Sequence, residues 1–222
     1  TLMTQTGKPN LARDLLRIHR IITRGLDVSI GKANEFAREG FPEAELKEGY
    51  RKYVTALLSF VSAHHLTEDE IAFPYFAERL PEMPFDRLEE EHEQIDRMLE
   101  QAQGHVEKLD TETEALRNLE TQQGEIREVW HPHIDIEEEY LDVERLGEML
   151  PVEEHERISG EMGKLSMEHA QPLHLVVPFA LYNLPSDERA ALTGNMPPKV
   201  IDDLMPGPWK EKWAPMQPFL LE

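Results

Sequence analysis

The chain has 222 residues, of which 44 are acidic and 23 are basic, so its formal net charge is −21. This charge disfavours binding to nucleic acid and to anionic membranes, because both surfaces attract basic side chains. The absence of cysteine excludes disulfide scaffolds, thiol catalysis and cysteine-ligated metal centres. No apolar run approaches the ~18–20 residues of a membrane span, and the first ten residues lack the apolar core of an export signal. We therefore expect a cytoplasmic protein.

Amphipathic helical periodicity dominates the first three quarters of the chain. The expected helices cover residues 10–39, 43–73, 85–109, 112–147 and 151–168. We expect Pro74 to end the second helix and Pro132 to kink or split the fourth. The four long segments with short joints predict an all-α fold, an up-down-up-down four-helix bundle with an additional C-terminal helix.

Proline placement divides the chain into two parts. Residues 1–170 hold 7 of the 16 prolines and residues 171–222 hold the other 9. We predict a helical domain over 1–170 and a proline-rich tail over 171–222. The aromatic side chains of the tail, which include Trp209 and Trp213, favour packing along the bundle rather than disorder. We also expect the tail to help form a homodimer.

Each of the four long apolar stripes contains a histidine in place of an apolar residue. These residues are His19, His64, His92 and His133. Glu68 and Glu137 each follow one of the histidines by four residues, on the same helix face. A buried carboxylate without a partner is costly, so a compensating charge is expected at this place.

The depth of the four histidines within their helices gives an independent test. With a rise of ~1.5 Å per residue, antiparallel packing brings all four to one level within ~4.5 Å. A cluster of imidazoles and carboxylates in a bundle core has the composition of a metal site that suits iron, manganese or zinc. Two carboxylates shared between helices indicate two metal ions.

At these residues the chain resembles the hemerythrin-like family of bacterial His–His–Glu cation-binding domains. The matching segments are IHRII at 18–22, AHHLTEDEIAFP at 63–74, EEEHEQI at 89–95 and HPHIDIEEEYL at 131–141. The resemblance covers about residues 10–145. It implies a non-haem di-iron centre, bridged by oxo or hydroxo groups and carboxylates, with a position open to a small ligand. By motif, the implied ligands are His19, His64, Glu68, His92, His133 and Glu137.

The chain departs from the oxygen-carrying members of that family in two places. They carry a second histidine four residues after the third-helix histidine, where this chain has Asp96. They place an aspartate five residues after the fourth-helix histidine, where this chain has Glu138. A site richer in carboxylates favours ferric iron, which argues against reversible oxygen carriage. Further candidate ligands in reserve are His65, Glu138, Glu89 and Asp96.

A ferritin-like di-iron site is an alternative interpretation of some of these residues. The pairs Glu89–His92 and Glu128–His131 match the Glu-x-x-His unit of ferritin-like di-iron proteins, although His131 lies off the apolar stripe. Among the remaining histidines, His155 lies in an acidic run, and we expect it to be solvated.

Three functions are compatible with such a centre. The first is binding or sensing of dioxygen, nitric oxide or peroxide at an open iron position. The second is enzymatic, with decomposition of peroxide or reduction of nitric oxide at the same centre. The third is iron homeostasis, in which metal occupancy controls stability or partner binding. The sequence does not identify a redox partner.

Overall fold

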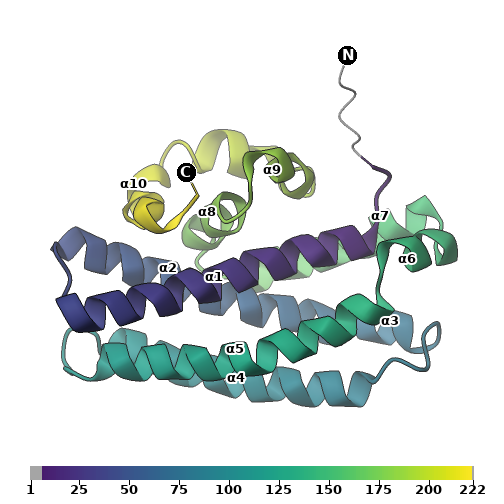
Figure 1. The fold of residues 1–222 in the computed structure, drawn as a ribbon. Helices are drawn as coiled ribbons and strands as arrows, with labels where there is room; N and C mark the ends of the chain where they lie inside the picture. The colour runs from purple at the N-terminus through teal and green to yellow at the C-terminus, as the bar shows by residue number, and fades with distance from the viewer. Residues whose placement is uncertain (1–6, 222) are drawn as a thin grey trace.

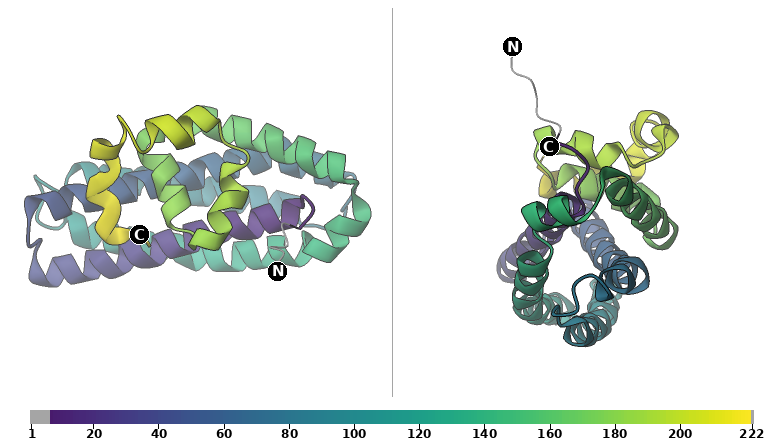
Figure 2. Two further views of the ribbon diagram at one scale, coloured as in Figure 1. Left: turned by 90° about the horizontal axis from the view of Figure 1, so that it is seen from above. Right: turned by 90° about the vertical axis from the view of Figure 1, so that its right-hand side faces the viewer.

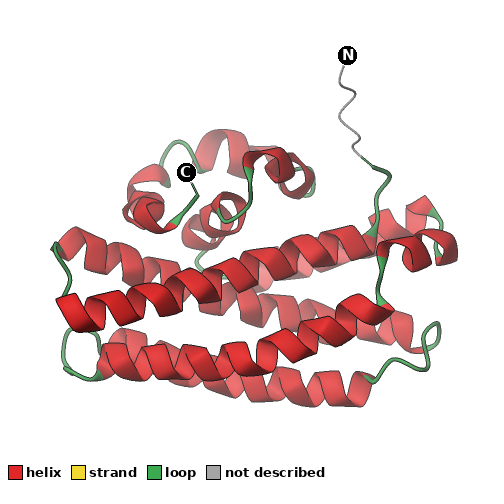
Figure 3. Ribbon diagram, in the orientation of Figure 1, coloured by secondary structure: helices red, strands yellow, loops and turns green. Residues whose placement is uncertain are grey.

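Helices make up nearly the whole of the computed structural model, which describes residues 7–221 (Figure 1). The four longest are α1 (Leu11–Glu39), α2 (Ala44–Thr67), α4 (Phe85–Glu107) and α5 (Ala115–Tyr140). Consecutive members of this set run in opposite directions along one axis (Figure 1). No strand occurs among residues 7–221 (Figure 3). The predicted all-α class is confirmed.

The remaining helices are shorter. They are α3 (Phe73–Ala77), α6 (Val143–Met149), α7 (Val152–His169), α8 (Leu173–Tyr182), α9 (Ser186–Thr193) and α10 (Lys210–Trp213). Two π turns lie at Glu68–Ala72 and Lys199–Leu204, and a 3-10 helix lies at Ala214–Phe219. The helix expected over 151–168 coincides with α7. Within residues 7–221, none of these helices combines the length and the apolar character needed to cross a lipid bilayer.

Helix α1 is fixed at both ends by local interactions. The side chain of Asn10 accepts hydrogen bonds from the backbone N–H groups of Ala12 and Arg13, which otherwise lack partners in the first turn. At the other end, Gly40 has a φ of 80° and donates its N–H to the carbonyl of Phe36. Glycine tolerates this left-handed backbone without a steric penalty. The limits of the helix therefore follow from the sequence.

The second helix does not end at Pro74 as predicted. A π turn at Glu68–Ala72 follows α2, and the helix then continues as α3 to Ala77. Pro74 lies in the first turn of α3, where a backbone N–H is not required. Single π turns within helices are frequent at functional sites, because the extra residue rotates the side chains that follow.

The fourth helix is shorter than predicted, and Pro132 does not split it. Helix α5 continues through Pro132 and ends at Tyr140. Asp142 then caps α6 by accepting a hydrogen bond of 2.8 Å from the N–H of Arg145. This cap starts a new helix direction, so residues 143–147 belong to α6 instead of extending α5.

Apolar side chains form two separate buried clusters along the bundle. The larger cluster includes Ile22, Leu57, Ile95, Ile126 and the tail residue Phe179. The smaller cluster includes Leu11, Phe73, Phe76, Leu88 and Leu146. On α1 and α4 the histidine of the stripe falls between residues of the two clusters, and His64 lies in the chain between Ala63 of the larger cluster and Ala72 of the smaller one. A polar layer therefore crosses the core of the bundle.

The segment after residue 170 lies over α1 and α2 (Figure 2). Its buried aromatic side chains, Phe179, Trp213 and Phe219, belong to the same apolar cluster as the bundle core. Arg24 of α1 donates hydrogen bonds to the side-chain oxygen of Asn183 at 2.9 Å and to the carbonyl of Phe219 at 3.2 Å. Apolar packing buries the segment, and polar contacts of this kind fix its orientation relative to the bundle.

The expectation that His155 is solvated is wrong. Only 2% of this residue is exposed. Its Nδ1 accepts a hydrogen bond of 3.0 Å from the N–H of Leu11, and its Nε2–H donates one of 3.1 Å to the carbonyl of Leu146. His155 therefore joins α7 to the starts of α1 and α6, and its role here is structural.

We predict that Gly49→Ala destabilises the protein by about 1–3 kcal/mol, because the added methyl group overpacks a closed contact. A Cβ at Gly49 would lie 1.9 Å from the backbone oxygen of Pro215. Gly104→Ala is the matched control, because a Cβ there meets no atom within 4 Å. The control variant should be more stable than the wild type by up to about 1 kcal/mol, because alanine has a higher helix propensity than glycine. Urea unfolding measures both changes, and equal stability of the two variants would contradict the close packing of this segment.

Candidate metal centre

The four long helices each place one histidine in the polar layer of the core. These residues are His19 of α1, His64 of α2, His92 of α4 and His133 of α5, exposed by 1%, 6%, 1% and 0%. Two carboxylates join them: Glu68, the first residue of the π turn, and Glu137, one turn after His133. Exposure of these two glutamates is 1% and 0%.

The two carboxylates each lie between two histidines. Glu68 places Oε1 3.4 Å from His64 Nε2 and Oε2 3.2 Å from His92 Nε2. Glu137 places Oε2 3.0 Å from His19 Nε2 and Oε1 3.0 Å from His133 Nε2. One oxygen of each glutamate thus faces the α1–α2 pair of histidines, and the other faces the α4–α5 pair.

These contacts define two sets of donor atoms that share both glutamates. The first set contains His19, His64, Glu68 and Glu137, and the second contains His92, His133, Glu68 and Glu137. Within each set, one donor atom per residue lies within 4.8 Å of all the others. Each set is therefore compact enough to surround a single ion.

Hydrogen bonding leaves the donor atoms of this cluster unsatisfied. Both oxygens of Glu68 and Glu137, and the Nε2 atoms of His19 and His64, are buried. The facing nitrogen and oxygen atoms lie 3.0–3.4 Å apart, but none of them makes a hydrogen bond of regular geometry among residues 7–221. The Nε2 atoms of His92 and His133 face each other at 3.0 Å. Burying such groups costs several kcal/mol each unless a compensating charge is present. Cations between the two glutamates fit this arrangement, and nitrogen and oxygen donors suit iron, manganese or zinc.

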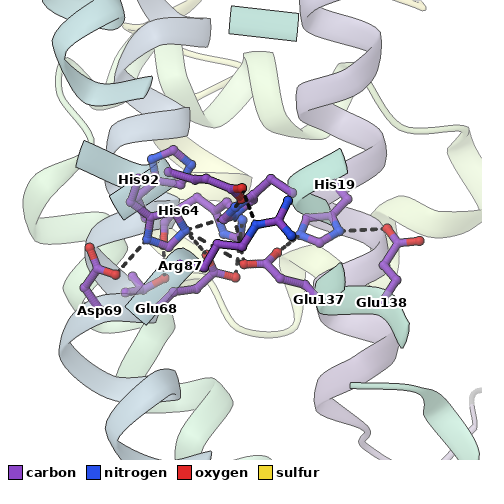
Figure 4. A network of polar contacts seen from close by, with 12 residues as sticks. His19, His64, Glu68, Asp69, Arg87, His92, Glu137 and Glu138 are labelled. Carbon is purple, nitrogen blue, oxygen red and sulfur yellow. Dashed lines mark hydrogen bonds and ion pairs between the residues drawn. The ribbon is translucent and has the colours of Figure 1, made fainter. Parts of the chain in front are cut away.

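Carboxylates outside the cluster orient three of the histidines (Figure 4). The Nδ1–H of His19 donates to Glu138 at 2.8 Å, and that of His92 donates to Asp69 at 2.7 Å. The Nδ1–H of His133 donates to Glu91 at 2.9 Å. Such bonds fix the tautomer that leaves Nε2 free to bind a metal and raise its basicity.

The pKa values of the clustered groups depend strongly on one another. Burial would raise the pKa of Glu137, but partners of opposite charge keep it well below its ordinary value. Burial and the charge of Glu137 raise the pKa of Glu68 to about 7. Burial lowers the pKa of His19 and His92, but neighbouring carboxylates more than offset it, so the values rise to about 9 and about 12. Burial holds the pKa of His64 well below its ordinary value, in the neutral form that binds metals. Without metal ions, protons must be shared among tightly packed groups.

Aromatic side chains separate the cluster from water. Trp130 packs edge-on against His19, with ring centroids 5.4 Å apart, and donates its indole N–H to Thr23 at 3.0 Å. Phe73 stacks on His92 with centroids 5.3 Å apart. The low dielectric of these walls strengthens the electrostatic interactions between the cluster and any bound cation.

His65 lies at the edge of the second set. Its ring stacks on that of His92 with centroids 4.1 Å apart, and its Nδ1–H donates to Asp96 at 3.1 Å. Its Nε2 is buried without a partner among the described residues. His65, His92 and His133 form a third compact group of potential donors. His65 is therefore placed to add a third imidazole to the α4–α5 pair.

The structure brings together all six residues that the sequence nominates as ligands. Of the reserve candidates, His65 lies at the cluster, whereas Glu138 and Asp96 contact the outer nitrogens of histidines. Sequence reasoning missed Asp69 and Glu91 as orienting carboxylates. Each stands directly beside a nominated residue in the chain, which is the only signal the sequence offers for them.

The ferritin-like alternative is not formed. Glu89, Glu128 and His131 are all exposed. His92 is the only one of the four residues in that pattern that reaches the buried cluster in the described part of the chain. Neither Glu-x-x-His pair therefore brings both of its residues to the buried cluster.

Fold and donor set together define a helical protein with a buried cation-binding cluster. Residues 10–141 match the family model described as the hemerythrin HHE cation-binding domain. The match covers more than half of the 222 residues, and the chain belongs to this family. The resemblance seen in the sequence is confirmed. Comparisons with curated proteins and with solved structures gave no match.

We predict that His133→Ala strongly lowers the metal content of the protein, because it removes one nitrogen donor from the second set. His131→Ala is the control, since His131 lies two residues away on the same helix and is exposed. Elemental analysis of both purified variants measures the outcome. Equal loss of metal from both variants, or from neither, would contradict the donor assignment.

We predict that Glu138→Ala weakens metal binding by about 10–100-fold, because His19 loses the acceptor that orients it. Glu139→Ala is matched in charge and helix position, and Glu139 is exposed. Titration against a competing chelator gives both affinities. The orienting role of Glu138 is wrong if the two variants bind metal equally.

Proposed function

We propose that this protein is a non-haem di-iron protein that binds or senses a small ligand, either dioxygen, nitric oxide or peroxide. In this proposal His19 and His64 would hold one iron, His92 and His133 would hold the other, and Glu68 and Glu137 could contribute to both. His65 completes the second set. The observation that carries the proposal is that each buried glutamate offers one oxygen to each pair of histidines.

When bound, two such irons supply paired one-electron chemistry and a Lewis-acidic position for a small ligand. The protein's own contribution is to hold the donors in a fixed arrangement. Asp69, Glu91 and Glu138 orient imidazoles, and the aromatic walls exclude bulk water. The acidic neighbours of His19, His92 and His133 make these three imidazoles stronger donors, which favours ferric over ferrous iron and so argues for reaction or sensing over reversible carriage.

The proposal extends to the architecture and setting of the protein. The four long helices would be the up-down-up-down bundle of a domain over 1–170, with α7 as its fifth helix and 171–222 as a packed tail. The cytoplasmic location, the homodimer and a redox partner stay predictions. Trp213 and Phe219 are buried against the bundle, so a dimer contact would use other residues of the tail.

Two alternatives use the same residues. One is an enzyme that decomposes peroxide or reduces nitric oxide, and the other is an iron-homeostasis protein whose stability depends on metal. The polar layer across the core favours the iron-homeostasis alternative in one respect. Loss of metal should weaken the fold, because it would leave two buried glutamates without the cations proposed to bind them.

We expect protein purified under air to contain two irons per chain and to show charge-transfer absorption of a bridged ferric pair. Dioxygen, nitric oxide and hydrogen peroxide, each added to the reduced protein, then separate the functions. A stable spectral change supports binding or sensing, and repeated consumption of the ligand supports the enzyme. Protein that takes up no iron, or only one per chain, would contradict the di-iron proposal.

A further inference from the structure

A mostly apolar pocket of about 160 Å³ lies beside the cluster, between α1, α2, α7 and the segment after α9. Its apolar lining includes Leu15, Ile18, Phe60, Met162, Met167 and Met196. An apolar cavity of roughly 150 Å³ is large enough to hold benzene. Flexible methionine side chains adapt to ligands of different shape. The pocket therefore suits a small apolar organic molecule.

The pocket reaches the candidate metal centre. His64 and Glu68, which belong to the first donor set, are part of its lining. A molecule inside the pocket would therefore lie next to the first metal position. Apolar pockets with a few polar groups at defined places are the usual form of small-molecule sites.

A second polar group in the lining indicates the chemistry of the ligand. Arg17 and Asp14 line the pocket and are paired, with Nη1 2.9 Å from Oδ1. The Nε–H of Arg17 is buried without an acceptor in the described part of the chain. An oxygen of a ligand would satisfy this donor. Because Asp14 already balances the charge of Arg17 and the chain is strongly acidic, an uncharged oxygen is favoured over a carboxylate.

Elements outside the family match build one side of this pocket. Met162, Gly163 and Met167 come from α7, and Met196 follows α9, whereas the matched region ends at residue 141. The pocket is thus a feature that this chain adds beside the cation-binding cluster.

We propose that this pocket binds an uncharged, apolar organic molecule of about the size of benzene that carries a single oxygen group, such as an alcohol, a carbonyl compound or an organic hydroperoxide. Its apolar body lies among the methionine and leucine side chains. The position of such a ligand beside iron rests on the proposed function, whereas its binding to the pocket does not.

Two glycines of α7 provide a matched test. Gly163 lines the pocket, Gly160 is exposed and does not, and a Cβ at either meets no atom within 4 Å. Gly163→Leu should fill the pocket, and Gly160→Leu should leave it open. Calorimetric titration with benzyl alcohol should show saturable binding to the wild type and to Gly160→Leu, and at least ~10-fold weaker binding to Gly163→Leu. Benzoate should bind the wild type at least ~10-fold more weakly than benzyl alcohol.

A second measurement does not depend on any variant. With methyl-labelled methionine, benzyl alcohol should shift the NMR signals of Met162, Met167 and Met196 and leave those of the other described methionines unchanged. The proposal is overturned if binding is absent, if Gly163→Leu binds as the wild type does, if benzoate binds as tightly, or if other methionines respond instead.

Iron content measured on the same samples keeps the two proposals apart. Iron-loaded protein that does not bind benzyl alcohol would contradict the pocket alone. Protein without iron that binds it would contradict the proposed function alone. Where both hold, benzyl alcohol should also perturb the absorption of the loaded centre, because the pocket lining includes His64 and Glu68.

Discussion

The fold depends on two glutamates that are buried between histidines. Glu68 and Glu137 would be among the most unfavourable side chains to place in a helical core, because both carboxylates are buried and, among residues 7–221, their contacts with imidazole nitrogens are not regular hydrogen bonds. Without cations, burial and then the charge of Glu137 raise the pKa of Glu68, so the two carboxylates compete for protons from the neighbouring imidazoles. Two cations between the glutamates would neutralise the layer and tie all four long helices together. The stability of the protein would then depend on its metal occupancy.

The same layer explains how the rest of the molecule is arranged. Apolar clusters on either side of it bury the two ends of the bundle, while Trp130 and Phe73 close the cluster laterally. Helix α7 and the tail cover the face formed by α1 and α2, and they enclose the apolar pocket that reaches His64. The α1–α2 side of the centre is therefore the side from which an organic ligand would approach.

Much of this site could be predicted from the sequence, because a histidine that replaces an apolar residue in a helical stripe can be recognised from its spacing alone. The four histidines and Glu137 follow helical spacing directly. The π turn at Glu68–Ala72 could not be predicted, since one extra residue in a helix leaves no clear mark in the hydrophobic period. His155 was misjudged because its buried partners are backbone groups of distant helices, and the acidic residues around it suggested solvent. The pocket could not be predicted, because its lining comes from α1, α2, α7 and residues of the tail, which meet only in the folded protein.

Anomalous X-ray scattering at the iron edge, from crystals of protein purified under air, tests the central claim most directly. Two iron peaks should appear about 3.5–4 Å apart, as in other two-metal sites, and each should contact one oxygen of Glu68 and one of Glu137. A single peak, no peak between these glutamates, or iron bound only at surface carboxylates would contradict the account.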